Sequence, residues 1–528
     1  MLAEPMRCKT NIFKLSLLCA VIIFVASCGG GDEQSNSDAN TWVAGSYLAS
    51  SEFADRCQTP RSGTDVYTGQ AYPDKQGTQM DEKMYLRSFS HETYLWYDEL
   101  PDPNPANFSS VLRYFDELKT SEKTDSGRDK DEFHFDESYD DYMAESQSGV
   151  QLGFGLHWSF QQVMAPRVII VAFTDDNSPA AIAGVTRGDT LKKINDVDVV
   201  NSNNQAELDI INGALFSPKL DTDYQFTFET VTGSEKTVTL KAKEVLVSYV
   251  KNNKIIEANG KKVGYIQYNG FMSMAQDDLI SAFTAFSEDG VDDLVLDMRY
   301  NGGGLLYQSA QVGYMIAGEG SQNRTFSQQV YNDKIEPDDP IPFFPFAIDW
   351  DALKVGDELP SVNMEKVYIL SSSNTASASE ALINGLRGID IEVILIGGTT
   401  RGKPYGFIPQ PNCGWVYYTV QFKGENEKGF ADFADGFVPT NKNDIDLEMG
   451  LDAKVPGCMV EDDFDHTLGD SNEATLAAAL NYMETETCPV SGVINVAPTQ
   501  DMLARPGLAI KPPFHPLRNS MVIRTIKD

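Results

Sequence analysis

One stretch near the middle of the chain constrains the fold more than any other. Between residues 367 and 403, an apolar run leads into small polar residues, a helix-like segment, a second apolar run and a glycine-rich turn. This order predicts a strand, a sharp turn, a helix, a second strand and a loop that ends at Lys403. Ser377 stands at the first turn, where the start of a helix leaves backbone N–H groups unpaired beside its hydroxyl. That arrangement suits a nucleophile with an oxyanion site.

The same serine has a simpler interpretation. Ser377 and Glu380 have the S/T-x-x-E spacing of a capping box, in which the hydroxyl caps the helix and the glutamate reaches back to the backbone. Helix caps are far commoner than nucleophiles. The choice between the two interpretations therefore depends on the rest of the chain.

Length and charge set the outer bounds. The chain has 528 residues, which is enough for about three domains. Its net charge is −35, from 42 basic and 77 acidic residues, so that phosphate would be repelled and no nucleic-acid partner is expected. The five histidines are scattered and no cysteine pair has C-x-x-C spacing. The sequence therefore implies no metal and no nucleotide or other cofactor.

Residues 1–28 have the pattern of an export signal. Basic residues precede the apolar run Leu15 to Ala26, which is short for a transmembrane helix. The run ends in Val-Ala-Ser-Cys28 and resembles a bacterial lipobox, which makes Cys28 the expected lipidation site and membrane anchor. An ordinary signal with an incidental cysteine is the alternative. Either way, we expect a protein of the bacterial cell envelope, periplasmic or at the cell surface, with the outer membrane favoured over the inner.

The region after the signal is polar until helical spacing begins. Residues 29–80 are rich in Gly, Ser, Asp and Thr and are predicted to be a flexible linker. Residues 81–148 carry apolar side chains at helical spacing and predict a small N-terminal helical domain. Four cysteines remain outside the signal, an even number that predicts one or two disulfides in an oxidising compartment, with pairing that the spacing does not encode. They are Cys57, Cys413, Cys458 and Cys488.

Residues 149–245 are rich in short β-runs. The loop sequence Leu152-Gly153-Phe154 and a later Ser-Pro-Ala…Ala-Gly-Val…Gly-Asp segment resemble those of a PDZ domain. The resemblance implies that these three residues bind the terminal carboxylate of a peptide that adds as an extended strand. A PDZ-like fold without a peptide ligand is the alternative.

Alternating strands and helices are predicted over residues 246–490. A buried strand at Leu294 to Arg299 runs into a turn with three glycines, Gly302 to Gly304. Glycines at a strand end allow close backbone approach and leave N–H groups pointing outward. No Lys-Ser/Thr follows at phosphate-loop spacing, so the turn suits an oxyanion better than a phosphate. The tail of residues 491–528 is uninterpreted.

Taken in order, these stretches resemble the carboxy-terminal processing peptidases, also called tail-specific proteases. The resemblance covers about residues 80 to 460 and includes Tyr-Leu-Trp-Tyr97, the PDZ-like segment, the glycine turn, Thr-Ala-Ser-Ala-Ser-Glu380 and Gly-Lys403. It implies a multidomain α+β protein. The parts would be a small helical domain, a β-rich PDZ domain and an α/β serine peptidase domain of the crotonase/ClpP-like type.

The resemblance also assigns roles. Ser377 would be the nucleophile and Lys403 the general base, while the N–H groups of Gly303 and Ala378 would hold the oxyanion. A lysine with its reference pKa near 10.4 is a poor base, so Lys403 must be desolvated. The implied substrates are envelope or extracellular proteins or peptides with apolar C-termini. The sequence does not reveal the cleavage preference, the oligomeric state or whether the PDZ module activates or inhibits the peptidase.

One departure from the family pattern concerns the lysine. Phe407 stands where many members have a glutamine that supports the amine, so the orientation of Lys403 must come from elsewhere. This departure favours one alternative, a PDZ peptide-binding scaffold with weak or lost catalysis. A small-molecule hydratase on a similar α/β core is a second alternative.

Other polar residues near the proposed site receive supporting roles. Ser379 is the alternate hydroxyl and is assigned to helix capping or support. Asp297 and Arg299 are interpreted as strand-end residues that hold the glycine turn, not as an acid–base pair.

Overall fold

The computed structural model describes residues 41–348, 356–445, 449–489, 510 and 521–522. The predicted signal with Cys28 and most of the tail after residue 490 lie outside the described residues. Within these ranges the chain is a multidomain α+β protein. No helix in them is long and apolar enough to cross a membrane.

The N-terminal region is built on α1 (Gln79–Thr93), which begins with a capping box between Thr78 and Asp81. It also contains α2 (Val111–Phe115), α3 (Tyr139–Ser148) and the short parallel pair β1 (Arg56–Cys57) and β2 (Lys75–Gln76). Its strand β3 (Phe135–Ser138) pairs with β22 (Trp415–Tyr418), which in turn pairs with β21 (Gln410–Asn412). The predicted helical region therefore also contributes a strand to a sheet whose other strands lie after Lys403.

The prediction of a flexible linker up to residue 80 is wrong for residues 41–78. Phe53 is fully buried in the core formed with α1, and Cys57 forms a disulfide with Cys413 across a Cα–Cα distance of 5.3 Å. The polar composition of this region did not reveal that Phe53 packs into a core and that Cys57 forms a disulfide. The other two cysteines, Cys458 and Cys488, also form a disulfide, so both of the one or two disulfides expected from the cysteine count are present.

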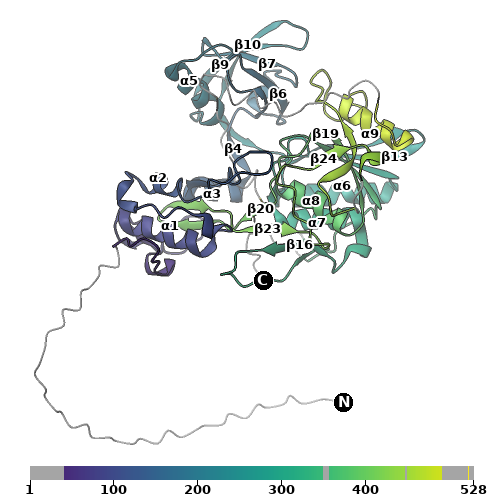
Figure 1. Cartoon of the computed structure of the whole chain (residues 1–528). Helices are drawn as coiled ribbons and strands as arrows, with labels where there is room; N and C mark the ends of the chain where they lie inside the picture. The colour runs from purple at the N-terminus through teal and green to yellow at the C-terminus, as the bar shows by residue number, and fades with distance from the viewer. Residues whose placement is uncertain (1–40, 349–355, 446–448, 490–509, 511–520, 523–528) are drawn as a thin grey trace, which may run out of the picture. The chain divides into compact units, whose positions relative to one another are not determined.

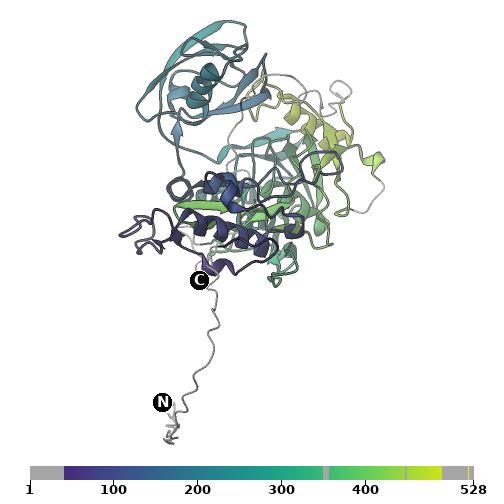
Figure 2. The ribbon, with the colours of Figure 1, turned by 60° about the vertical axis from the view of Figure 1, so that its left-hand side comes forward.

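Residues 156–241 form an antiparallel sheet. Its order is β10-β9-β7-β6-β5, and β8 (Val197–Asp198) pairs with β7. The strands are β5 (Leu156–Gln162), β6 (Val168–Thr174), β7 (Thr190–Ile194), β9 (Asp223–Glu229) and β10 (Glu235–Lys241). Helix α5 (Gln205–Phe216) lies against this sheet, in the blue to teal part of the ribbon in Figure 2. It buries Leu208 and Ile211 in a cluster with Phe226 of the sheet, and α4 (Pro179–Ile182) is a single turn. β4 (Val150–Gly153) and β11 (Lys243–Leu246) pair at the two ends of this module.

The central sheet has the order β12-β13-β14-β18-β19-β25-β24 and is parallel except for the β12–β13 pair. Its strands are β12 (Val250–Ala258), β13 (Lys261–Tyr268), β14 (Asp293–Asp297), β18 (Lys366–Ser371), β19 (Glu392–Gly397), β25 (Lys454–Met459) and β24 (Val438–Thr440).

Helices cover both faces of this sheet (Figure 1). The period-2 alternation along β18 places Ile369 in the core with α6 (Gln276–Asp289), α7 (Leu306–Ala317) and α8 (Ala378–Gly388), and Leu370 in the core with α9 (Ala474–Thr485). Parallel strands buried on both faces explain the continuous apolar runs of the sequence. The predicted order of strand, turn, helix and strand around Ser377 is confirmed as β18, α8 and β19.

A second sheet flanks the site. Its order is β15-β26-β20-β23-β16-β17, and β20, β23 and β16 are labelled in Figure 1. Its strands are β15 (Gly304–Leu305), β26 (Met521–Val522), β20 (Tyr405–Phe407), β23 (Phe422–Glu425), β16 (Thr325–Val330) and β17 (Ile341–Pro342). The glycine turn leads into β15, and the loop of Lys403 leads into β20.

Candidate active site

Ser377 occupies the turn between β18 and α8 in an unusual backbone conformation. Its φ is +61° and its ψ is −111°, which a residue with a Cβ adopts at an energetic cost. The side chain is fully buried. Ser377 and Glu380 have the arrangement of a capping box, but Ser377 Oγ makes no hydrogen bond of standard distance and angle with the described residues. Buried hydroxyls usually have a partner, so a strained and unpartnered one at a strand-to-helix turn suggests a functional role.

Glu380 ties this turn to the lysine loop. Its Oε2 accepts hydrogen bonds from the N–H groups of Ser377 and Lys403, both at 2.8 Å. Its Oε1 accepts from Gly402 N–H at 2.7 Å and from Thr400 Oγ1 at 2.6 Å. The predicted reach of Glu380 to the backbone of Ser377 is confirmed. One buried carboxylate thus fixes the backbone of both proposed reactive residues.

The amine of Lys403 lies between aromatic rings. Its Nζ is 4.4 Å from the ring centroid of Phe407 and 4.7 Å from that of Phe133, and the residue is fully buried. Burial lowers the pKa of Lys403 well below its ordinary value, and the nearby charge of Asp131 opposes this effect. A lysine in such surroundings is held neutral more readily and can accept a proton.

Phe407 therefore takes part in the site where the family pattern has a glutamine. It supplies an aromatic face to the amine instead of a hydrogen-bonding side chain. The second ring, Phe133, was missed by the sequence reasoning. It precedes β3 in the N-terminal region, some 270 residues before the lysine, and no motif or spacing links the two.

The glycine turn is held against the nucleophile turn by Asn301. Its backbone oxygen accepts from Ala376 N–H at 3.1 Å and from Ser379 Oγ at 2.9 Å. Its side-chain Oδ1 accepts from Gly303 N–H at 3.0 Å. Ser379 thus has the supporting contact that we expected, while Asn301 was given no role from the sequence.

The two proposed oxyanion donors differ in this conformation. Ala378 N–H is at the first position of α8, where a helix has no internal acceptor for it. Gly303 N–H points to Asn301 Oδ1, so it would have to leave that acceptor to reach an oxyanion. Both roles stay predictions.

Asp297 and Arg299 form a buried ion pair at the end of β14, and their predicted role in holding the glycine turn stays a prediction. Arg299 donates to Asp297 at 2.6 Å and to Glu473, at the start of α9, at 2.6 Å. Its backbone oxygen accepts from Ser372 Oγ in the nucleophile turn. Both carboxylate oxygens of Asp297 accept hydrogen bonds, from Arg299 and from Tyr265.

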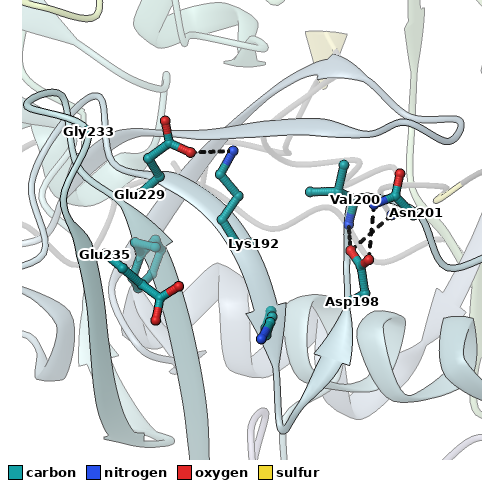
Figure 3. Close-up of a pocket in the computed structure, with 9 residues that line it drawn as sticks. Lys192, Asp198, Val200, Asn201, Glu229, Gly233 and Glu235 are labelled. Atoms are coloured by element: carbon teal, nitrogen blue, oxygen red, sulfur yellow. Dashed lines mark hydrogen bonds and ion pairs between the residues drawn. The ribbon is translucent and has the colours of Figure 1, made fainter.

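The predicted carboxylate-binding loop lies between β4 and β5. Leu152 and Gly153 end β4, and Phe154 is buried in the core of the antiparallel module. A surface depression of the same module lies elsewhere, around the β7–β8 turn (Figure 3). Three of its charged groups are paired locally, because Lys192 pairs with Glu229 at 2.8 Å and Asp198 accepts from the backbone N–H groups of Val200 and Asn201. This depression therefore holds no reactive constellation.

Comparison with known proteins gives a consistent relationship. Residues 262–419, which include Ser377 and Lys403, match the model of Peptidase family S41, and residues 86–135 match the Peptidase S41 N-terminal domain. No group of three His, Cys, Asp or Glu side chains in the described ranges could hold a metal ion.

Two curated relatives carry names from the same family. The carboxyl-terminal-processing protease of Picosynechococcus sp. is 28% identical over 262 residues, which is 49% of this chain and 56% of that protein. The chloroplastic carboxyl-terminal-processing peptidase 1 of Arabidopsis thaliana is 24% identical over 245 residues, 43% of this chain and 42% of that protein. The chain thus matches about half the length of these relatives.

A solved structure shares the fold. The crystal structure of an S41 protease from Bacteroides fragilis has a TM-score of 0.57 and 24% identity, and the match covers 79% of this chain and 98% of that one.

Proposed function

Because the chain carries a peptidase family S41 domain together with the N-terminal domain of that family, we propose that it is a serine endopeptidase with a Ser377/Lys403 dyad. The observation that carries this proposal is that the backbone N–H groups of Ser377 and Lys403 donate to the same carboxylate, Glu380. This carboxylate holds together a buried serine, whose Oγ makes no hydrogen bond with the described residues, and a desolvated lysine.

The proposed reaction is acyl transfer. Neutral Lys403 takes the proton of Ser377 Oγ as the oxygen attacks the scissile carbonyl, and the N–H groups of Ala378 and Gly303 stabilise the oxyanion. The lysine then gives its proton to the leaving amine. Water hydrolyses the acyl-enzyme with the same lysine as base. The Asn301 contact of Gly303 would break when the oxyanion forms, which makes this donor one that strengthens late.

The antiparallel module of residues 149–245 is proposed to be a PDZ domain that presents substrate tails. Its terminal strand β5 is an edge of the sheet, and edges accept an added strand. Leu152, Gly153 and Phe154 would bind the carboxylate of a protein with an apolar C-terminus. The α/β domain that follows is proposed to be of the crotonase/ClpP-like type.

An oxidising location fits the covalent structure. Two disulfides, Cys57–Cys413 and Cys458–Cys488, are typical of envelope or extracellular proteins. We propose that lipidation at Cys28 anchors the chain to a bacterial membrane, with the outer membrane favoured.

The test compares the parent with Ser377→Ala and Lys403→Met on an unfolded protein with an apolar C-terminus. Ser373→Ala is the matched control, because this exposed serine lies in the same turn. We expect fragments from the parent and the control only. Binding without cleavage by the parent would favour the alternative, an inactive PDZ scaffold.

A further inference from the structure

A short strand from the far C-terminus completes the sheet beside the proposed active site. β26 lies between β15 and β20 and is parallel to both. Met521 is in register with Gly304 and Gly406, and Val522 with Leu305 and Phe407. Among the described residues, β15 has no strand partner but β26 in this sheet, so the tail strand is what joins β15 to the rest.

Both neighbours of β26 are direct continuations of the proposed catalytic loops. β15 begins immediately after Gly303, and β20 begins two residues after Lys403. The tail strand also contacts α8, whose first residue follows Ser377. Three elements that carry the nucleophile, the base and the glycine turn therefore meet the same two residues.

The proposed dyad is closed in this arrangement. Ser377 and Lys403 each have 0% of their surface exposed. A substrate carbonyl must approach within about 3–3.5 Å of the nucleophile before reaction. A segment that covers the site must therefore move away before substrate can bind. β26 is a candidate for this segment, because it pairs with β15 and β20, which follow the glycine turn and Lys403.

The tail has a second point of attachment. Ile510 is buried in the core cluster of the antiparallel module, and its N–H donates to Val163 O, just after β5, at 3.1 Å. The tail thus contacts both the module proposed to bind substrate tails and the site proposed to cut them. A segment tethered in this way competes at a high effective concentration.

We propose that the space between β15 and β20 is a binding site for an extended polypeptide strand, and that the chain's own C-terminal segment occupies it as an intramolecular competitor of substrate. This inference rests on the proposed function, because it identifies the ligand class of the same site. Recognition through backbone pairing on both sides is tolerant of sequence. The position in register with Leu305 and Phe407, both buried, favours an apolar residue.

The test uses the full chain with Ser377→Ala, so that a bound peptide stays intact. Val522→Pro is added to remove one backbone N–H from β26, and Val522→Ala is the matched control that keeps it. The probe is a fluorescein-labelled peptide with the sequence of residues 515–528, and binding is measured by anisotropy. The same peptide with proline in place of Val522 controls for electrostatic attraction to the acidic protein. A chain that ends at Ile510 is a second variant in which β26 does not occupy the proposed site. Thermal unfolding verifies that every variant is folded.

We expect the Val522→Pro chain and the shortened chain to bind the peptide at least about tenfold more tightly than the Val522→Ala chain does. None of the chains should bind the peptide that carries proline. Equal binding by all chains, or no binding to the opened ones, overturns the inference.

A parallel assay separates the two proposals. Variants with Ser377 intact are tested for hydrolysis of a denatured protein. A difference in binding without any hydrolysis would leave the strand site standing and remove the peptidase. If the parent and Val522→Pro hydrolyse the protein at equal rates and all chains bind the peptide equally, the peptidase proposal stands and the strand site is refuted.

Discussion

The two halves of the proposed dyad lie in different surroundings. The Ser377 turn is fixed by hydrogen bonds, because the N–H of Ser377 donates to Glu380. Ala376 N–H and Ser379 Oγ donate to the backbone oxygen of Asn301. The amine of Lys403 lies against two aromatic rings, those of Phe133 and Phe407. The difference follows from the tasks, because a nucleophile needs position whereas a lysine base needs a lowered pKa. Glu380 is the one group among these that serves both halves.

The largest effect should come from removing the amine. Lys403→Met should lower kcat/KM by about a thousandfold or more, since general-base catalysis is lost. The same substitution should raise stability although it lowers activity. The pKa of Lys403 is lowered in the folded state, so below the ordinary lysine pKa the unfolded chain binds more protons than the native chain, and stability falls as pH falls. Methionine removes this penalty and should raise the free energy of unfolding by about 1 kcal/mol.

The control for the lysine is Lys243→Met, at an exposed position on β11. It should change neither quantity. A Lys403→Met chain that is active, or one that is less stable than the parent at pH 7, would contradict the account of a desolvated base.

The shared carboxylate gives the next effect. Glu380→Gln places an amide N–H where a carboxylate oxygen accepts two donors, so two of the four hydrogen bonds are lost. We expect a loss of about 2–3 kcal/mol in the free energy of unfolding. Activity should fall by about a hundredfold, because both proposed reactive residues lose position. Glu288→Gln, an exposed change on α6, should do neither. Activity equal to that of the parent would show that Glu380 does not join the two halves.

A smaller effect should follow from removing one of the two aromatic rings beside the amine of Lys403. Phe133→Ala admits water to the amine, and its pKa should move toward the ordinary value. The acid limb of the pH profile of kcat/KM should then move to higher pH. At any pH below the limb, activity should fall by about tenfold for every pH unit that the limb moves. Phe108→Ala, which removes a ring that packs on Tyr114 in the same region, is the control. An unchanged acid limb would mean that the ring does not exclude water from Lys403.

The smallest effect concerns the N-terminal region that supplies Phe133. Burial lowers the pKa of the adjacent His134 to about 4. Between pH 6.5 and 4 the unfolded chain binds a proton that the native chain does not, so stability is lost as pH falls through this window. Urea unfolding of the parent should lose about 2 kcal/mol more over this range than that of His134→Gln. Parallel losses in the two proteins would refute a buried neutral histidine.

The sequence predicted the serine half of the site far better than the lysine half. The order of β18, α8 and β19, the glycine turn and the reach of Glu380 to Ser377 are local, because spacing and apolar runs encode them within a few residues. The ring of Phe133, the disulfide Cys57–Cys413 and the strand β26 are contacts between segments far apart in the chain. Local patterns carry no information about such pairings. For the same reason, the packed residues 41–78 were predicted to be a linker.

The most direct test of the Ser377/Lys403 proposal is the rate at which a reactive ester acylates the protein, followed by intact mass across pH. The account predicts a single adduct on Ser377 whose rate of formation rises with pH through one ionisation below the ordinary lysine value, and no adduct in Lys403→Met. Acylation of Ser377 at the same rate in Lys403→Met, or at another residue in the parent, would contradict it.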